Sequence, residues 1–110
     1  MQWSQLEDAN WYVRHDALKK LGKRAELYPE TLEQHADAVL ARLEDSHSGV
    51  RDMALQTLAK LEPATLAQHA GSVVARLEDS VVRVRWVAMR TLGKLEPTTL
   101  AQHAGAVVAR

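Results

Sequence analysis

The amino-acid sequence predicts an all-α protein in which about three similar helix pairs stack into a solenoid. Three observations predict this fold: a repeat of 34 residues, apolar stripes with a helical period in both halves of each repeat, and no segment that alternates with period two. Because the units of such a repeat bury their apolar faces against their neighbours, we expect the copies to stack in chain order.

The repeat divides the chain of 110 residues into three units within a single domain. The second and third units are identical at 24 of their 34 positions. The first unit is more diverged and carries three extra residues, best placed at Arg24-Ala25-Glu26. The predicted units of the domain 1–110 are residues 1–42, 43–76 and 77–110.

One helix of each predicted pair contains the sequence TLAQHAG or a close variant. In the second unit it begins at Pro63, whose fixed φ and missing N–H suit the first helical turn. Its apolar stripe has the spacing i, i+4, i+7, i+8 and i+11 and consists of Leu66, Ala70, Val73, Val74 and Leu77. We therefore expect one continuous helix whose stripe faces the core.

A polar turn and a second helix complete the pair. Asp79 and Ser80 form the turn, and Ser80 or a neighbour is the expected N-cap. The second helix is expected to end before Pro97, because the residue that precedes a proline avoids the α region. Its apolar stripe consists of Val84, Ala88, Leu92 and Leu95.

This second helix carries the same motif in each unit. The pattern D-S-x-x-x-V-R-x-x-A-x-x-x-L-x-K-L occurs at 79–95 and 45–61, and residues 8–21 read D-A-N-W-Y-V-R-H-D-A-L-K-K-L. Three copies in register resemble the HEAT repeat, above all its short variety in bilin-lyase-like and artificial arrays. The resemblance covers nearly the whole chain. It implies a right-handed α-α superhelix, with the helix that carries the Val-Arg pair (the V-R helix) lining the concave side and the TLAQHAG helix outside.

The resemblance also implies a ladder of ion pairs that runs along the stack. An aspartate at the start of a helix complements the helix dipole, and the fork of an arginine can bridge two partners at once. We interpret the six residues of this ladder as structural: Asp8, Arg14, Asp45, Arg51, Asp79 and Arg85.

Differences between the second and third units are concentrated on the V-R helix. Of ten differing positions, eight lie on this helix or in the turn before it. Three of the eight are apolar or nearly so in both units and are expected to adjust the core: Met53/Val87, Leu55/Met89 and Ala59/Gly93. At the other five positions, the two units differ in charge or size by more than a buried site would tolerate. Together with residues of the first unit they define the variable face: Trp11, Tyr12, His15, Lys19, Ser48, Asp52, Gln56, Val82, Arg83, Trp86 and Arg90.

The variable face is predicted to bind a protein partner. Three of the five aromatic residues of the chain lie on it, and positions 48, 52 and 56 are four apart and so line one exposed ridge. Trp, Tyr and Arg dominate the energetics of protein interfaces. We therefore hypothesise a non-catalytic scaffold that acts through its concave face. The alternative is neutral drift on a tolerant surface, with the aromatic rings half-covered by their neighbours.

The sequence offers no constellation for catalysis, a cofactor or a metal. His35, His69 and His103 recur once per unit, but stacked helices stand about 8–10 Å apart, whereas zinc needs ligands at about 2.0–2.1 Å. A packing or capping role is expected for these three, and His15 and His47 are expected to be isolated and exposed. The HEAT-type deoxyhypusine hydroxylases build a di-iron site from His-Glu pairs, and no glutamate follows a histidine here. We predict neither an enzyme nor a cofactor.

The charge balance argues against nucleic acid and membranes as partners. Lysine plus arginine and aspartate plus glutamate number 14 each, whereas a groove that tracks phosphates should be basic throughout. The second unit has Gln56 where its neighbours have Lys19 and Arg90, and it adds the acidic Asp52, so a nucleic-acid module is only the second alternative. No apolar stretch could span a bilayer, and the absence of cysteine and of a leader favours a cytoplasmic location. Some cationic surface is expected from Lys19, Lys20, Arg83 and Arg90.

The two ends of the chain differ in how far they are adapted to face solvent. Asp16 and Lys20 make the first unit partly polar, as the end of a solenoid requires. Val107 and Val108, in contrast, would face a V-R helix that does not follow. We expect a homo-oligomer that forms through the repeat ends, or a piece of a longer array. The near-identity of the units fits recent duplication or a consensus-style construction, and a purely structural fragment without a ligand is the first alternative to the scaffold.

Overall fold

The computed structural model describes residues 2–103, which contain α-helices and short 3-10 helices but no strand. Each V-R helix is a single α-helix, and each TLAQHAG segment folds into shorter pieces. In chain order the elements are η1 (Gln2–Glu7), α1 (Trp11–Leu27), α2 (Pro29–Gln34), α3 (Ala36–Ala41), η2 (Arg42–Glu44), α4 (Ser48–Leu58), α5 (Pro63–Ala67), α6 (Ala70–Ala75), η3 (Arg76–Glu78), α7 (Val82–Leu92) and α8 (Pro97–Gln102).

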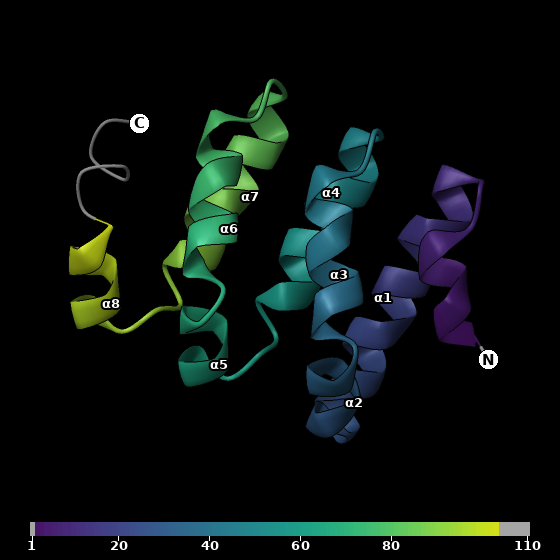
Figure 1. Ribbon diagram of the computed structural model, residues 1–110, viewed down its shortest axis with the longest axis horizontal. Helices are drawn as coiled ribbons and strands as arrows, with labels where there is room; N and C mark the ends of the chain where they lie inside the picture. Colours follow the sequence, from purple (N-terminus) through teal and green to yellow (C-terminus); the bar gives the residue numbers. More distant parts are fainter. Residues whose placement is uncertain (1, 104–110) are drawn as a thin grey trace.

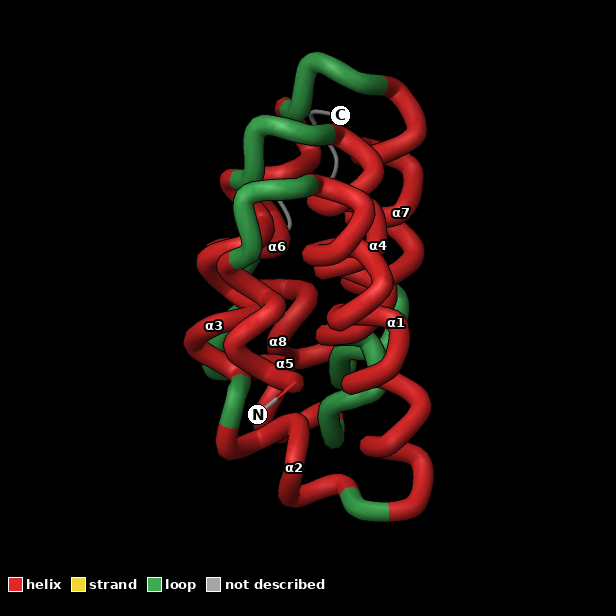
Figure 2. Tube along the Cα trace, turned by 90° about the vertical axis from the view of Figure 1, so that its right-hand side faces the viewer, coloured by secondary structure: helices red, strands yellow, loops and turns green. Residues whose placement is uncertain are grey.

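The helices form two layers, and the units follow one another along the long axis of the molecule. In Figure 1 the colours succeed one another from purple to yellow along this axis, in chain order. Figure 2 shows the V-R helices α1, α4 and α7 in one layer and α3 and α6 in the other. Helix α4 contacts both α1 and α7, and the molecule measures 40 × 29 × 16 Å. The predicted all-α stack of helix pairs is confirmed.

Apolar side chains of both layers form one continuous core along the stack. In the V-R helices, the buried side chains of Leu21, Leu58 and Leu92 occupy the same position of the three units. In the other layer, Leu32 and Leu66 are equivalent and also buried. Burying one leucine contributes about 1.5–3 kcal/mol. These repeated rows therefore hold neighbouring units together.

The prediction of one continuous TLAQHAG helix is wrong, because the helix breaks at its histidine. His35 separates α2 from α3 and His69 separates α5 from α6, with φ near −113° and ψ near 14° at both breaks. The local backbone bonds are of the 3-10 type, as from the N–H of His69 to the carbonyl of Leu66 at 2.9 Å. Leu66 and Ala70 are nevertheless both buried. Periodicity could not reveal the break, since the apolar stripe continues through it.

The turn before each V-R helix is closed by an aspartate. The Asp45 carboxylate accepts the N–H of His47 at 2.9 Å, and the Asp79 carboxylate accepts the N–H of Val81 at 3.0 Å. This bond to the residue two positions on is typical of aspartate in turns. As a result the N-cap of α7 is the neighbour Val81 and not Ser80.

Helix α1 is longer than its counterparts, at 17 residues against 11 in both α4 and α7. The three extra residues of the first unit lie in its last turns. Ala25 is buried there, whereas Glu26 is exposed and its carboxylate lies 2.6 Å from Nζ of Lys60. The longer helix thus brings a carboxylate beside the second unit.

The two ends of the stack differ. Trp3 packs against the core from η1, and Asp16 and Lys20 are exposed on α1 and form an ion pair of 3.1 Å. The expected core role of Met89 is wrong, because 38% of its surface is exposed while its counterpart Leu55 is fully buried under α7. No described helix covers α7 in the same way. Val107 and Val108 lie outside the described residues.

Candidate functional site

In the first two V-R helices, the arginine of the Val-Arg pair joins two units. Arg14 donates to both carboxylate oxygens of Asp45, from Nε at 2.7 Å and from Nη2 at 2.8 Å, and its Nη1 donates to the backbone carbonyl of Asp8 at 2.8 Å. Arg51 repeats this arrangement on the Asp79 carboxylate at 2.8 and 3.1 Å and on the Asp45 carbonyl at 2.7 Å. Such bidentate pairs have a defined geometry as well as a favourable energy.

Burial and ion pairing act in opposite directions on the ladder carboxylates. Burial raises the pKa of Asp45, but hydrogen bonds from Arg14 and from the N–H of His47 outweigh it, and the net pKa lies below its usual value. The same balance, with Arg51, lowers the pKa of Asp79. Of the two kinds of contact, Arg85 makes the one to the carbonyl of its own unit, from Nη1 to Asp79 at 2.6 Å. The ladder thus serves the packing of units and leaves other residues for binding.

The eleven residues of the variable face all lie on α1, α4 or α7, and none of them is buried. The exposed fractions are 44% for Trp11, 58% for Tyr12, 68% for Val82 and 52% for Trp86. Ser48, Asp52 and His15 are half-buried, and Lys19, Gln56, Arg83 and Arg90 are exposed. Substitutions among the units therefore collect on a single layer.

A cluster of rings lies at the N-terminal ends of α1 and α4. The ring of Trp11 stacks on that of His47, with centroids 3.9 Å apart and planes inclined by 5°. Trp11 also meets Tyr12 and His15 edge to face, at 6.0 and 6.4 Å. The expectation that His15 and His47 are isolated and exposed is wrong, because both are half-buried and contact Trp11. His47 joins two units through its stack, and its Nδ1 accepts the N–H of Gly49 at 3.1 Å. Neither contact has a sequence signal, because the motif does not include these positions.

Trp86 lies among cations on α7. The guanidinium carbons of Arg83 and Arg90 are 5.1 and 4.9 Å from the Trp86 ring, within the range of cation–π attraction. Nε of Arg83 donates to the Asp52 carboxylate at 3.1 Å, and Asp52 accepts from Nε2 of Gln56 at 2.8 Å. Three variable positions are thus connected across α4 and α7. The Trp86 ring has defined neighbours and is still half-exposed.

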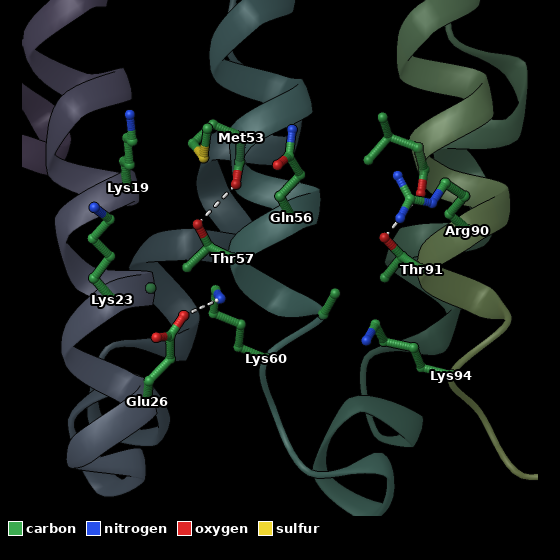
Figure 3. Close-up of a pocket in the computed structure, with 13 residues that line it drawn as sticks. Lys19, Lys23, Glu26, Met53, Gln56, Thr57, Lys60, Arg90, Thr91 and Lys94 are labelled. Atoms are coloured by element: carbon green, nitrogen blue, oxygen red, sulfur yellow. Dashed lines mark hydrogen bonds and ion pairs between the residues drawn. The ribbon is translucent and has the colours of Figure 1, made fainter.

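A groove of about 370 Å³ crosses the same layer nearer the C-terminal ends of the helices. Figure 3 shows side chains from α1, α4 and α7 lining it. Five of the lining residues are cations and one is acidic, Glu26; the cations are Lys19, Lys23, Lys60, Arg90 and Lys94. Sequence reasoning missed Lys23, Lys60 and Lys94, although the signal was present, since they occupy one equivalent position in the three units. Lysines here also complement the C-terminal dipoles of the V-R helices.

Comparison with known families agrees with this stacked geometry. A family model described as HEAT repeats matches residues 3–83. The chain belongs to the HEAT-repeat family. No curated protein matches it. HEAT repeats generally serve as non-catalytic scaffolds. The match ends within α7, and just beyond it Arg85 contacts the carbonyl of Asp79 as Arg51 contacts that of Asp45.

The histidines of the HEAT units do not converge. His35 and His69 lie at the helix breaks of successive units and make no side-chain capping bond. Within residues 2–103, no three histidine, aspartate or glutamate side chains are grouped so that they could hold a metal ion. Over the same residues, no helix has the length and apolar character needed to cross a bilayer.

Proposed function

We propose that this HEAT-repeat chain is a non-catalytic scaffold that binds a protein partner along the variable face of α1, α4 and α7. HEAT repeats commonly mediate protein interactions, and solenoids offer extended surfaces for this purpose. The observation that carries the proposal is the exposure of Trp11, Tyr12, Val82 and Trp86 on one layer of a molecule whose other large apolar side chains mostly lie in the core. Apolar groups that gather on a surface mark interaction sites.

The surroundings of the rings favour binding over neutral drift. Trp11 is held by its stack on His47, and Trp86 is held by Arg83 and Arg90. Side chains that are already ordered lose little conformational entropy when a partner docks, and so more of their contact energy appears as affinity. A drifting surface has no reason to order its aromatic side chains in this way.

Selection of peptides from a random displayed library, with the wild-type chain as bait, tests the proposal. We expect the selected peptides to bind Trp86→Ala about 2–4 kcal/mol more weakly than wild type, as is typical of a central aromatic residue. Because Trp86 is half-exposed, the helical circular dichroism signal should not change. Fluorescence anisotropy of the labelled peptides gives both dissociation constants.

Tyr28→Ala is the matched control. Tyr28 is an exposed aromatic residue with its own arginine, Arg24, at 4.9 Å, but it lies after α1 and away from the variable face. Its removal should change the affinity by less than about twofold. Peptides that bind wild type and Trp86→Ala equally well, or that depend on Tyr28 instead, would contradict the proposal.

A further inference from the structure

The cations of the groove form a band that follows the repeat. Lys23, Lys60 and Lys94 occupy the same position of successive units, so that each unit contributes one lysine, on α1 or just after α4 and α7. Lys19 and Arg90 lie one helical turn before this row, on α1 and α7. Figure 3 shows these side chains reaching into the space between the helices.

The band is a local excess of positive charge in a chain whose net charge is zero. Asp45 and Asp79 are paired with arginines in the buried ladder. Among residues 2–103, Glu26 is the one carboxylate that lines the groove, and it is paired with Lys60 at 2.6 Å. Lys19, Arg90 and Lys94 have no ion pair with any carboxylate in the described part of the chain. Grooves lined by one sign of charge concentrate ligands of the opposite sign.

The spacing of the band points to a particular backbone conformation. Packed helices lie about 8–10 Å apart, so successive lysines of the row start from backbones separated by about this distance. A segment in the polyproline II conformation rises about 3.1 Å per residue with three residues per turn, so every third side chain points the same way, about 9 Å from the last. One carboxylate at every third residue would therefore meet one lysine per unit.

We propose that the groove binds an acidic protein segment in the polyproline II conformation, with one carboxylate for each repeat unit. This inference rests on the proposed function, because the groove lies in the layer of the variable face. Trp86 lies next to the band, since Arg90 contacts its ring and also lines the groove. Polyproline II segments commonly dock against aromatic side chains, and Trp86 would offer one beside the groove, whose described lining residues include no aromatic ring.

A peptide fits the surface better than a nucleic acid does. A surface that tracks phosphates is basic along its whole length. Here Glu26 lies inside the groove, and Asp52 follows on the variable face beside Arg83. The band of cations is thus interrupted by Glu26 and followed by Asp52, an arrangement that suits a partner whose carboxylates are spaced at intervals.

The probe for the test is a fluorescein-labelled peptide of repeated Glu-Pro-Ala triplets, and fluorescence anisotropy measures its binding. We expect the variant Lys23→Gln/Lys60→Gln/Lys94→Gln to bind it about tenfold more weakly, because three exposed charge pairs are lost. Glu26→Gln should bind about twofold more tightly, since it removes the one competing carboxylate among the described residues that line the groove. Added salt should weaken binding to wild type, because exposed charges are screened over about 8 Å at physiological ionic strength.

Lys20→Gln is the matched control, because Lys20 is an exposed lysine of α1 that lies outside the groove and pairs with Asp16. It should leave the affinity unchanged. A peptide of the same composition with its glutamates gathered at one end should bind more weakly than the triplet repeat. Equal binding of these two peptides, no loss in the triple variant, or tighter binding of an oligothymidine than of the peptide would each overturn the inference.

The outcomes also separate this inference from the proposed function. In one case, the selected peptides depend on Trp86 and still bind the triple lysine variant as tightly as wild type. That result would support the scaffold proposal and contradict the inference of an acidic partner. In the opposite case, binding of the triplet peptide depends on the lysines, and binding of the selected peptides does not depend on Trp86. That result would support binding in the groove and contradict the proposed role of the aromatic residues.

Discussion

At the scale of single residues, the arginines of the V-R helices do the most to connect the units. Arg14 and Arg51 each use one part of the guanidinium for a carboxylate of the next unit and another for a backbone carbonyl of their own unit. Removing a guanidinium and a carboxylate from water is costly, and only good geometry with further hydrogen bonds offsets that cost. The resemblance to HEAT repeats implied these partners, but the two-sided use of each arginine became visible only in three dimensions.

Arg51→Ala should therefore destabilise the fold by about 3–5 kcal/mol, because it leaves the buried carboxylate of Asp79 without its main partner. Arg83→Ala is the matched control: it breaks a second arginine–aspartate pair between the same two units, with Asp52, which is far more exposed. Its cost should be about 0–1 kcal/mol. Urea titrations followed by circular dichroism measure both changes in the free energy of unfolding. Equal losses would mean that burial does not set the strength of the pair.

The ladder also predicts sensitivity to acid. The folded-state pKa values of Asp45 and Asp79 lie below their ordinary values. As the pH falls, the unfolded chain therefore binds protons first, and the stabilisation that is complete above the unfolded-state pKa of about 4 is lost toward the lower folded-state pKa. We expect the free energy of unfolding to decrease steadily below about pH 5.

Urea titrations at stepped pH measure this decrease, and Asp79→Asn is the informative variant. It should be less stable than wild type at neutral pH, with a shallower pH dependence, because one titrating carboxylate is gone. An identical pH slope in the two proteins would assign the acid sensitivity to other carboxylates.

At the scale of helices, the sequence predicted which segments are helical better than it predicted whether each helix is continuous. The two apolar stripes and Pro63 located the helices of a unit correctly. The break at His69 was missed, because Leu66 and Ala70 stay buried on both sides of it. A stripe reports which residues face the core and is blind to a local change in backbone hydrogen bonding.

Helix α1 offers a test of packing between V-R helices. A Cβ atom at Gly22 would lie 3.2 Å from Cε of Lys60, a contact that the flexible lysine side chain can relieve by a small shift. The equivalent residue of the second unit is Ala59. Gly22→Ala should therefore raise the free energy of unfolding by about 0.5–1 kcal/mol through the higher helix propensity of alanine.

Thermal unfolding measures this gain. The double variant Gly22→Ala/Lys60→Ala removes the close neighbour, so it should show the effect of the alanine without the contact. A lower stability of Gly22→Ala, restored in the double variant, would show that Lys60 is held in place by Glu26 and cannot move aside.

At the scale of the whole molecule, stability should vary along the stack. Helix α4 contacts a V-R helix on both sides, whereas α8 contains no buried residue. In repeat arrays each unit is stabilised by its neighbours, and local opening is easiest where neighbours are fewest. We expect native-state hydrogen exchange to be slowest in α4 around Leu55 and Leu58, intermediate in α1 and α7, and fastest in α8. Uniform protection of α1, α4 and α7 would mean that the array opens only as a single unit.

Whole-molecule charge concealed the groove. The 14 basic and 14 acidic residues predicted no net electrostatic field. Most of the carboxylates, however, lie outside the groove, whose described lining holds five cations and Glu26. The variable face could be assigned to one layer from the differences between units, because only exposed positions tolerate such changes. The lysine row was missed for the opposite reason, since Lys60 and Lys94 are repeated and so looked like part of the scaffold.

The likeness of the two ladder joints has a consequence for how such a chain can change. Arg14 holds Asp45 and Arg51 holds Asp79 with the same atoms in the same roles. If residues 43–76 were excised, Arg14 would find Asp79 where Asp45 had been, and the surrounding leucines would match as before. Repeat units joined in this way are interchangeable. Recombination within the coding sequence can lengthen or shorten the protein without inventing a new interface.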